Sequence, residues 1–206
     1  MSNQLTVNFS KEDVQLVNCV NQRVIVLKQL PGSSADVAWL VFEAFEKNTV
    51  SWNPEYSVYA SRSDIEAGAV IDKQSETGLL PGGSQLNFKQ GAFDFINKKG
   101  DPGTYNVNYI QAGLYDEQPI TIGLAQPATV NGNISSDPKI ISAGNVLFSD
   151  NIKMTPEEKI TVFMQSQIQT GQVLSTITSQ AITLEFSGSN NNQSITYQNG
   201  TFVKDS

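Results

Sequence analysis

Residues 37–60 read VAWLVFEAFEKNTVSWNPEYSVYA and contain both tryptophans of the chain. Residues 37–42 form an unbroken apolar run, which is typical of a strand that is buried on both faces. From Thr49 onward, apolar and polar side chains alternate, as in a strand with one buried and one solvated face. We therefore predict two core strands joined by a polar bend at residues 46–48, with aromatic side chains on which the remaining strands pack.

The composition of the whole chain favours β-structure. Charged residues make up 16% of the 206 residues, against about 25% in a typical soluble domain. Asn, Gln, Ser and Thr fill the difference and together account for about a third of the chain. Such uncharged polar side chains suit the solvent faces and turns of strands. They suit long solvated helices less well, because those usually carry Glu and Lys.

Turn signals recur along the chain and divide it into short segments. The clearest is the Asn-Gly pair at residues 199–200, which predicts a two-residue hairpin that pairs Tyr197 with Phe202. Residues 14–30 are rich in β-branched side chains, which favour strands. We interpret them either as a hairpin that turns at residues 21–22 or as one bent strand. No segment shows a strong amphipathic helical pattern.

These features predict an all-β, single-domain antiparallel sandwich of two sheets, of the jelly-roll or lectin-like kind. We expect ten to twelve strands over residues 1–206. A chain of this length is long enough to build one hydrophobic core. The single cysteine, Cys19, lies among apolar neighbours, and we expect it to be a buried side chain rather than a reactive thiol.

Net charge and hydropathy restrict the partners and the location. The formal net charge is −7, and the chain lacks the basic stripe of a nucleic-acid-binding protein. It has neither an 18-residue apolar run that would predict a membrane span nor the pattern of a secretory signal. We therefore expect a cytoplasmic protein, with non-classical release left open, that binds no nucleic acid and has no membrane span.

The chain contains no histidine, which excludes Ser-His-Asp and Cys-His catalysis and zinc sites that use histidine. It also has no glycine-rich nucleotide-binding motif. We therefore predict a protein that is not an enzyme. A glycosidase built on two carboxylates alone stays open, although no spacing singles out a pair. The acids considered for it are Glu43, Glu46, Glu55, Asp64 and Glu66.

We expect no metal ion or other cofactor. Calcium is a weakly supported exception, because it prefers carboxylate and carbonyl oxygens of the kind that loops supply. The acids in loop-like settings are Asp101, Asp116, Glu117 and Asp150. Because Asp is a common turn former, a bound ion is not needed to explain these residues.

Aromatic side chains beside amides and acids give the sharpest binding hypothesis. Sugar rings lie with their apolar faces against Trp or Tyr, while Asn, Asp and Gln bind the hydroxyl groups. The candidate ligand-binding residues are Trp52, Asn53, Glu55, Tyr56 and Tyr59, and a second aromatic cluster comprises Tyr105, Tyr109 and Tyr115. The competing interpretation is that these aromatic residues are core anchors.

The function that we predict first is a carbohydrate-binding, lectin-like module that works as a homo-oligomer, so that weak sites gain avidity. The alternative is a self-associating structural or storage protein without a small ligand, since uncharged polar strand faces suit contacts between sheets. A membrane-docking or pore-forming sandwich ranks third, because no basic amphipathic helix supports it.

Overall fold

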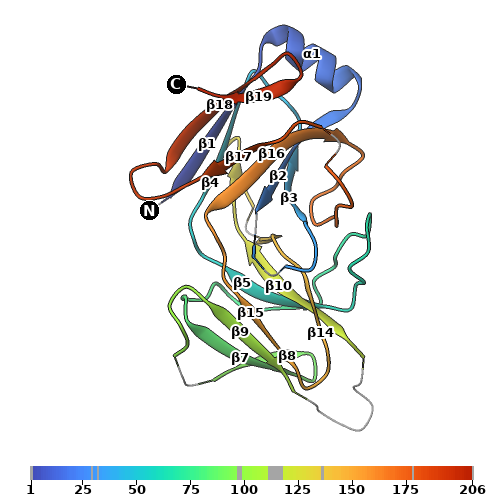
Figure 1. Ribbon diagram of the computed structural model, residues 1–206, viewed down its shortest axis with the longest axis vertical. Helices are drawn as coiled ribbons and strands as arrows, with labels where there is room; N and C mark the ends of the chain where they lie inside the picture. Colours follow the sequence, from blue (N-terminus) through green and yellow to red (C-terminus); the bar gives the residue numbers. More distant parts are fainter. Residues whose placement is uncertain are drawn as a thin grey trace.

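The computed structural model describes residues 2–28, 30–31, 33–96, 99–110, 118–135, 137–177 and 179–205. Within these residues the chain is all-β in character, with nineteen strands in four sheets and one short helix. Figure 1 shows an elongated molecule in which two of the sheets form the upper half and the other two form the lower half.

The upper half contains a six-stranded sheet and a four-stranded sheet. The six-stranded sheet has the order β12 (Asn133–Ile134), β11 (Thr129–Val130), β4 (Lys47–Trp52), β1 (Asn3–Asn8), β18 (Asn192–Gln198), β19 (Thr201–Lys204). The four-stranded sheet has the order β17 (Ile182–Glu185), β16 (Lys159–Ser166), β2 (Gln22–Lys28), β3 (Ala38–Phe42). The rings of Trp39 on β3 and Trp52 on β4 meet edge to face, 5.5 Å apart, in the core that the two sheets share.

The lower half also contains two sheets. The first has the order β13 (Lys139–Ile140), β10 (Ile120–Gln126), β5 (Ser57–Ser61), β6 (Ser75–Glu76), and β14 (Gly144–Val146) also pairs with β10. The second has the order β15 (Asn151–Met154), β9 (Tyr105–Tyr109), β7 (Ser84–Lys89), β8 (Ala92–Phe95). β15 contacts both β10 and β14, so the two sheets pack against each other. One cluster of buried side chains extends from Leu5 in the upper half to Leu86 in the lower half.

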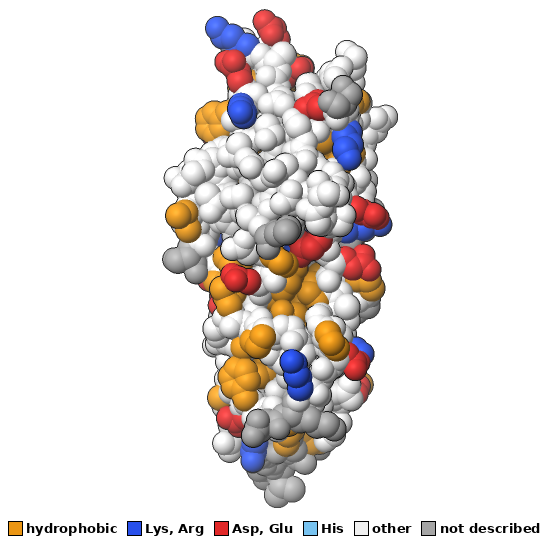
Figure 2. Space-filling view, turned by 90° about the vertical axis from the view of Figure 1, so that its left-hand side faces the viewer, with side chains coloured by type: hydrophobic (Ala, Val, Ile, Leu, Met, Phe, Trp, Pro, Cys, Tyr) orange, Lys and Arg blue, Asp and Glu red, His pale blue; other side chains and the backbone are white. Residues whose placement is uncertain are grey.

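Three connections that the structure describes in full cross the junction between the halves, a fourth leads from β12 to β13, and we call this region the waist. Residues 53–56 lead from β4 to β5, residues 127–128 lead from β10 to β11, and residues 155–158 lead from β15 to β16. Figure 2 shows one face of the molecule, where hydrophobic side chains gather at and below the waist and uncharged polar groups cover much of the upper half.

The prediction of an all-β fold is confirmed, but the prediction of two sheets and ten to twelve strands is wrong. The described residues form four sheets, and several of the nineteen strands are only two residues long. The pairing is mixed, because β1 runs parallel to β18 and β7 runs parallel to β9. The strands in residues 37–60 are not neighbours, since β3, β4 and β5 belong to three different sheets. Chain composition reports strand content, whereas sheet membership depends on partners far away in the sequence.

Residues 14–30 also differ from the prediction. Residues Lys11–Cys19 form the helix α1, and only Gln22–Lys28 form a strand. The side chain of Ser10 accepts a hydrogen bond from the backbone N–H of Asp13, which caps the helix. α1 buries only Val17, so its amphipathic signal is weak. Cys19 is exposed at the end of the helix, and the prediction that it is buried is wrong.

Local turn predictions are confirmed. Tyr197 pairs with Phe202 across the predicted hairpin. Asn199 and Gly200 have φ angles of 53° and 83°, as a type I′ turn requires. The Asn-Gly pair at residues 131–132 adopts the same conformation, with φ angles of 50° and 79°, between β11 and β12. Both hairpins therefore turn at an Asn-Gly pair, and in the one at residues 131–132 Asn131 also hydrogen-bonds to Asn48 and Thr49 on β4.

Candidate functional site

The waist holds a buried lysine at the centre of a polar network. The Nζ atom of Lys28 donates hydrogen bonds to the hydroxyl of Tyr56 at 2.9 Å, to Oε1 of Gln126 at 2.8 Å and to Oε1 of Glu158 at 2.9 Å. The Lys28 side chain has no exposed surface, whereas 23% of the Glu158 side chain is exposed. We call these four residues the waist network.

The strand ends at the waist bring the network together. Lys28 is the last residue of β2, and Gln126 is the last residue of β10. Tyr56 directly precedes β5, and Glu158 directly precedes β16. The network therefore ties strands of both halves to two of the connections between them, those at residues 53–56 and 155–158.

Glu158 accepts hydrogen bonds at both carboxylate oxygens. Oε2 accepts from the side-chain amide of Asn3 at 2.7 Å and from the indole N–H of Trp52 at 2.8 Å. Oε1 accepts from the hydroxyl of Tyr56 as well as from Lys28. A carboxylate with this many donors is held in its ionised form and in one orientation.

The network shifts the pKa values of its members. Burial lowers the pKa of Lys28 to about 8, although the charge of Glu158 and the hydrogen bond to it oppose this shift. Burial acts to raise the pKa of Glu158, but the charge of Lys28 and the hydrogen bonds from Tyr56, Lys28 and Trp52 outweigh it, so this pKa lies below its ordinary value. Burial, followed by the nearby charge of Glu158, raises the pKa of Tyr56. At neutral pH the network is therefore an ion pair with a neutral tyrosine.

Three aromatic rings surround the ammonium group of Lys28. Its Nζ lies 4.9 Å from the ring centroid of Tyr56, 5.7 Å from that of Trp39 and 5.9 Å from that of Trp52. At these distances the negative faces of the rings attract a cation. The two tryptophans and Tyr56 therefore stabilise a buried charge.

The prediction that the candidate aromatic residues present their faces to a ligand is wrong. The exposed fractions of Trp52 and Tyr56 are both 3%, and that of Tyr59 is 0%. Trp52 and Tyr56 bind Glu158, whereas the hydroxyl of Tyr59 donates to the backbone oxygen of Ser142 at 2.7 Å in a separate core cluster. A sugar ring cannot stack on these side chains because other protein atoms already cover them.

Two of the candidate residues do line a surface cavity together with Trp52. Asn53 and Glu55 are exposed, and the cavity has a volume of about 150 Å³. The facing wall comes from the connection after β10 and from the β11–β12 hairpin. The other lining residues are Ser2, Ser51, Pro127, Ala128, Thr129, Ile134 and Ser135. We call this cavity the waist pocket.

The waist pocket and the waist network share the segment 52–56. Trp52 lines the pocket and donates to Glu158 from its indole nitrogen. The backbone oxygen of Asn53 accepts a hydrogen bond of 2.7 Å from the side-chain amide of Gln126. The buried network therefore fixes the backbone of the pocket and leaves the side chains of Asn53 and Glu55 at its surface.

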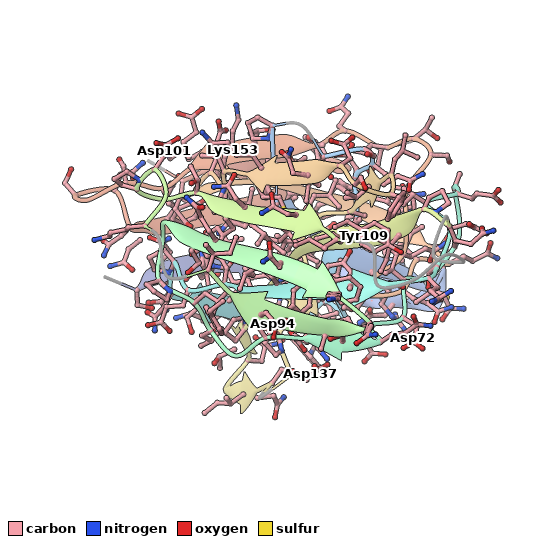
Figure 3. The ribbon with its side chains drawn as sticks, turned by 90° about the horizontal axis from the view of Figure 1, so that it is seen from below. Asp72, Asp94, Asp101, Tyr109, Asp137 and Lys153 are labelled. Atoms are coloured by element: carbon pink, nitrogen blue, oxygen red, sulfur yellow. The ribbon has the colours of Figure 1, made fainter. Side chains whose placement is uncertain are left out.

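The other predicted sites are placed as follows. Tyr105 and Tyr109 are buried, and Tyr115 lies outside the described residues. Asp101 pairs with Lys153 at 2.6 Å, and Figure 3 shows the two side by side.

Among the described residues, no group of three or more His, Cys, Asp and Glu side chains is arranged to hold a metal ion. Asp116 and Glu117 lie outside these residues. No helix in the described part of the chain is long and apolar enough to cross a membrane.

Lys28, Gln126 and Glu158 were not among the predicted site residues. Lys28 ends an apolar run, where a lysine usually marks the exposed end of a strand. Glu158 follows Pro156 and Glu157, a sequence that favours a solvated first helical turn. No local pattern marks the three residues as partners, because Gln126 and Glu158 lie 98 and 130 positions away from Lys28 in the sequence.

Comparison of the chain with protein-family models, with curated proteins and with solved structures finds no match.

Proposed function

We propose that this chain is a non-enzymatic binding module whose waist pocket binds a sugar or a similar small polyol. The observation that carries this proposal is the waist pocket itself, where the side chains of Asn53 and Glu55 border a cavity together with several hydroxyl groups. Amide, carboxylate and hydroxyl groups supply both donors and acceptors, which is what a ligand with many hydroxyl groups requires.

The size and the walls of the pocket also support a sugar. A volume of about 150 Å³ is below the range of about 300–1,000 Å³ for pockets that hold drug-sized ligands. Pro127 and Ile134 supply apolar surface beside the polar groups. In this proposal the apolar face of the sugar lies against these two side chains, and Trp52, which is 3% exposed, contributes little surface.

A lectin-like role explains how so shallow a pocket is useful. Such a site contacts only part of a monosaccharide, so its affinity is weak. Several copies that bind one glycan surface gain avidity without new contacts. We therefore include in the proposal that the protein works as a homo-oligomer of a lectin-like sandwich.

Nuclear magnetic resonance titration with a panel of neutral monosaccharides, followed by a glycan array at high protein concentration, tests this proposal. We expect one sugar class to shift the resonances of residues 51–55 and 127–135. Asn53→Ala removes an amide from the pocket, Glu55→Gln replaces its carboxylate by an amide, and each should weaken binding at least tenfold. Neither substitution removes the backbone oxygen of residue 53 that Gln126 binds.

Glu66→Gln is the matched control for Glu55→Gln. It changes an exposed acid that does not line the waist pocket, and the same net charge results. Binding that all three variants share with the wild type contradicts the proposed site. The absence of any sugar binding at millimolar ligand contradicts the proposed function.

One observation favours the alternative of self-association. Among the strands that the structure describes, β8 pairs only with β7 and is an edge of its sheet, and 66% of its residue Phe95 is exposed. An exposed edge strand with a large apolar side chain is a template for pairing with another chain. Light scattering of the wild type and of Phe95→Lys tests this alternative, which predicts an assembly that the substitution dissociates. A monomeric wild type contradicts it.

A further inference from the structure

The lower half contains a second cavity, which is independent of the waist pocket. It opens between the β10 sheet and the β9 sheet and has a volume of about 230 Å³. Its floor consists of the buried residues Phe88 on β7, Tyr109 on β9 and Ile120 on β10, together with Ala60 on β5. We call it the rim pocket. Figure 3 shows Tyr109 at the opposite end of this half from the ion pair of Asp101 and Lys153.

The rim of this pocket presents hydrogen-bond donors. Arg62, Gln74 and Gln90 line it and are exposed. Arg62 follows the last residue of β5, and Gln90 lies in the tight turn between β7 and β8, where its φ angle is 53° and that of Gly91 is 81°. A guanidinium group and two side-chain amides therefore stand above an apolar and aromatic floor, which is the usual arrangement of a small-molecule site.

The charge of the rim pocket is positive, although the chain carries a net charge of −7. Arg62 is the one charged side chain among the described residues that line it. The other arginine of the chain, Arg23, pairs with Glu43 at 2.9 Å, whereas Arg62 makes no ion pair with any acid in the described ranges. Its guanidinium fork is therefore available to an anion at the mouth of the cavity.

We propose that the rim pocket binds a small organic carboxylate, with the carboxylate on Arg62 and the body of the ligand in the cavity above the small exposed parts of its apolar floor. The planar guanidinium fork matches a carboxylate with two parallel hydrogen bonds. Gln74 and Gln90 donate to the remaining oxygen positions or to polar groups on the ligand. The apolar floor favours a ligand whose body is compact and has an apolar face.

A phosphate ester fits this site less well than a carboxylate. A phosphate monoester carries close to two negative charges at neutral pH, and the described lining offers a single cation. The acidic chain around the pocket repels a dianion more strongly than a monoanion. On its other side Arg62 borders a more open hollow that contains Asp64, which adds to this repulsion.

Titrations monitored by ¹H–¹⁵N spectra of the full chain test the proposal. The probes are benzoate and glucuronate. Benzamide is the neutral counterpart of benzoate, and glucose and glucose 6-phosphate are the neutral and the phosphorylated counterparts of glucuronate. We expect at least one carboxylate to shift the Arg62 side-chain resonance and those of Gln90 and Gly91, with its counterpart at least tenfold weaker. Binding should also weaken as salt is added.

Variants separate a carboxylate site from unspecific attraction. Arg62→Gln should weaken carboxylate binding at least tenfold, and Arg62→Lys should recover only part of it, because lysine keeps the charge but not the fork. Asp64→Asn should strengthen binding. Arg23→Gln is the matched control and should leave binding unchanged, since Arg23 lies on β2 in the upper half.

Three outcomes overturn the proposal. The first is that none of the carboxylates binds at millimolar concentration. The second is that Arg62→Gln binds as well as the wild type, and the third is that the neutral or the phosphorylated counterparts bind as tightly as the carboxylates. Asn53→Ala, which disables the waist pocket, should leave carboxylate binding intact, so failure of one proposal is distinguishable from failure of the other.

Discussion

The Nζ atom of Lys28 lies 2.9 Å from Oε1 of Glu158, and 130 positions of sequence separate the two residues. One partner is fully buried, and the other reaches the surface. A buried charge is strongly destabilising once its partner is removed, whereas the intact pair contributes little net stability by itself. Each residue therefore depends on the other, and loss of either one destabilises the waist.

The first prediction concerns the stability of variants in this pair. Glu158→Gln leaves the buried ammonium group without a counter-charge and should lower the free energy of unfolding by about 3–5 kcal/mol. Lys28→Met leaves a carboxylate that water reaches, so its cost should be smaller. Urea unfolding followed by circular dichroism measures both values. The double variant should lose less than the sum of the two, and additive losses would show that the pair is not coupled.

The second prediction concerns alkaline pH. The pKa of Lys28 is lowered from 10.5 to about 8, so between these values the unfolded chain binds more protons than the folded chain does. The contribution of Lys28 to the free energy of unfolding should therefore increase with pH across this window, by on the order of 3 kcal/mol in total. The measurement is urea unfolding of the wild type and of Lys28→Met from pH 7 to 9.5. The difference between the two should change in favour of the wild type, and a constant difference would mean that Lys28 keeps its ordinary pKa.

The third prediction concerns acid pH. The pKa of Glu158 lies below its ordinary value of 4.5, so its carboxylate stabilises the fold above that value. This stabilisation should disappear as the pH falls through the lowered pKa. Glu158→Gln, compared with the wild type between pH 3 and 7, should show a smaller loss of stability on acidification. Equal slopes for both proteins would assign the acid sensitivity to other carboxylates.

The fourth prediction concerns the two tryptophans. Trp39 is fully buried and Trp52 is 3% exposed, so iodide should quench the fluorescence of both only weakly in the folded protein. Trp52→Phe removes a donor to Glu158, and Trp39→Phe removes the donor to the backbone oxygen of Gln126. Each loss should cost about 1–3 kcal/mol of stability. Strong quenching that disappears in Trp52→Phe would show that Trp52 is open to solvent.

The fifth prediction concerns Gly123 on the central strand β10. A Cβ atom at this position would lie 2.0 Å from the backbone oxygen of Ser142 and 2.6 Å from the ring of Tyr59. Gly123→Ala should therefore lower the free energy of unfolding by roughly 3 kcal/mol or more, because both neighbours belong to the packed core. Gly188→Ala is the matched control, since a Cβ there meets nothing within 4 Å, and it should change stability little. Equal stabilities of the two variants would contradict the packing described for β10.

Local chemistry explains which parts of the fold were predictable. The Asn-Gly pairs at residues 131–132 and 199–200 favour their hairpins, because the positive φ angles that the turns need are a property of these residues. The β-rich composition predicts the all-β fold for a similar reason, since it sums over local preferences. Helix α1 was missed although its cap, Ser10, is a local signal. Its apolar face buries a single residue, so the helical hydrophobic pattern is weak.

The candidate site was only partly predictable. The segment containing Asn53 and Glu55 was identified from residue types alone, and both side chains line the waist pocket. The roles of Trp52 and Tyr56 depend on Glu158, which lies more than 100 positions away in the sequence. Whether an aromatic side chain meets a ligand or a buried charge depends on such distant partners, and residue type does not encode them.

The parallel pairing of β1 with β18 has a consequence for biosynthesis. Figure 1 shows the two strands side by side, and Gln4 is in register with Asn192. During translation β1 leaves the ribosome long before β18 has been synthesised. One edge of β1, which lies in the middle of the six-stranded sheet, therefore stays unpaired until then. We expect chaperones that shield such edges to raise the yield of native protein, and cell-free synthesis without them to leave more of it aggregated.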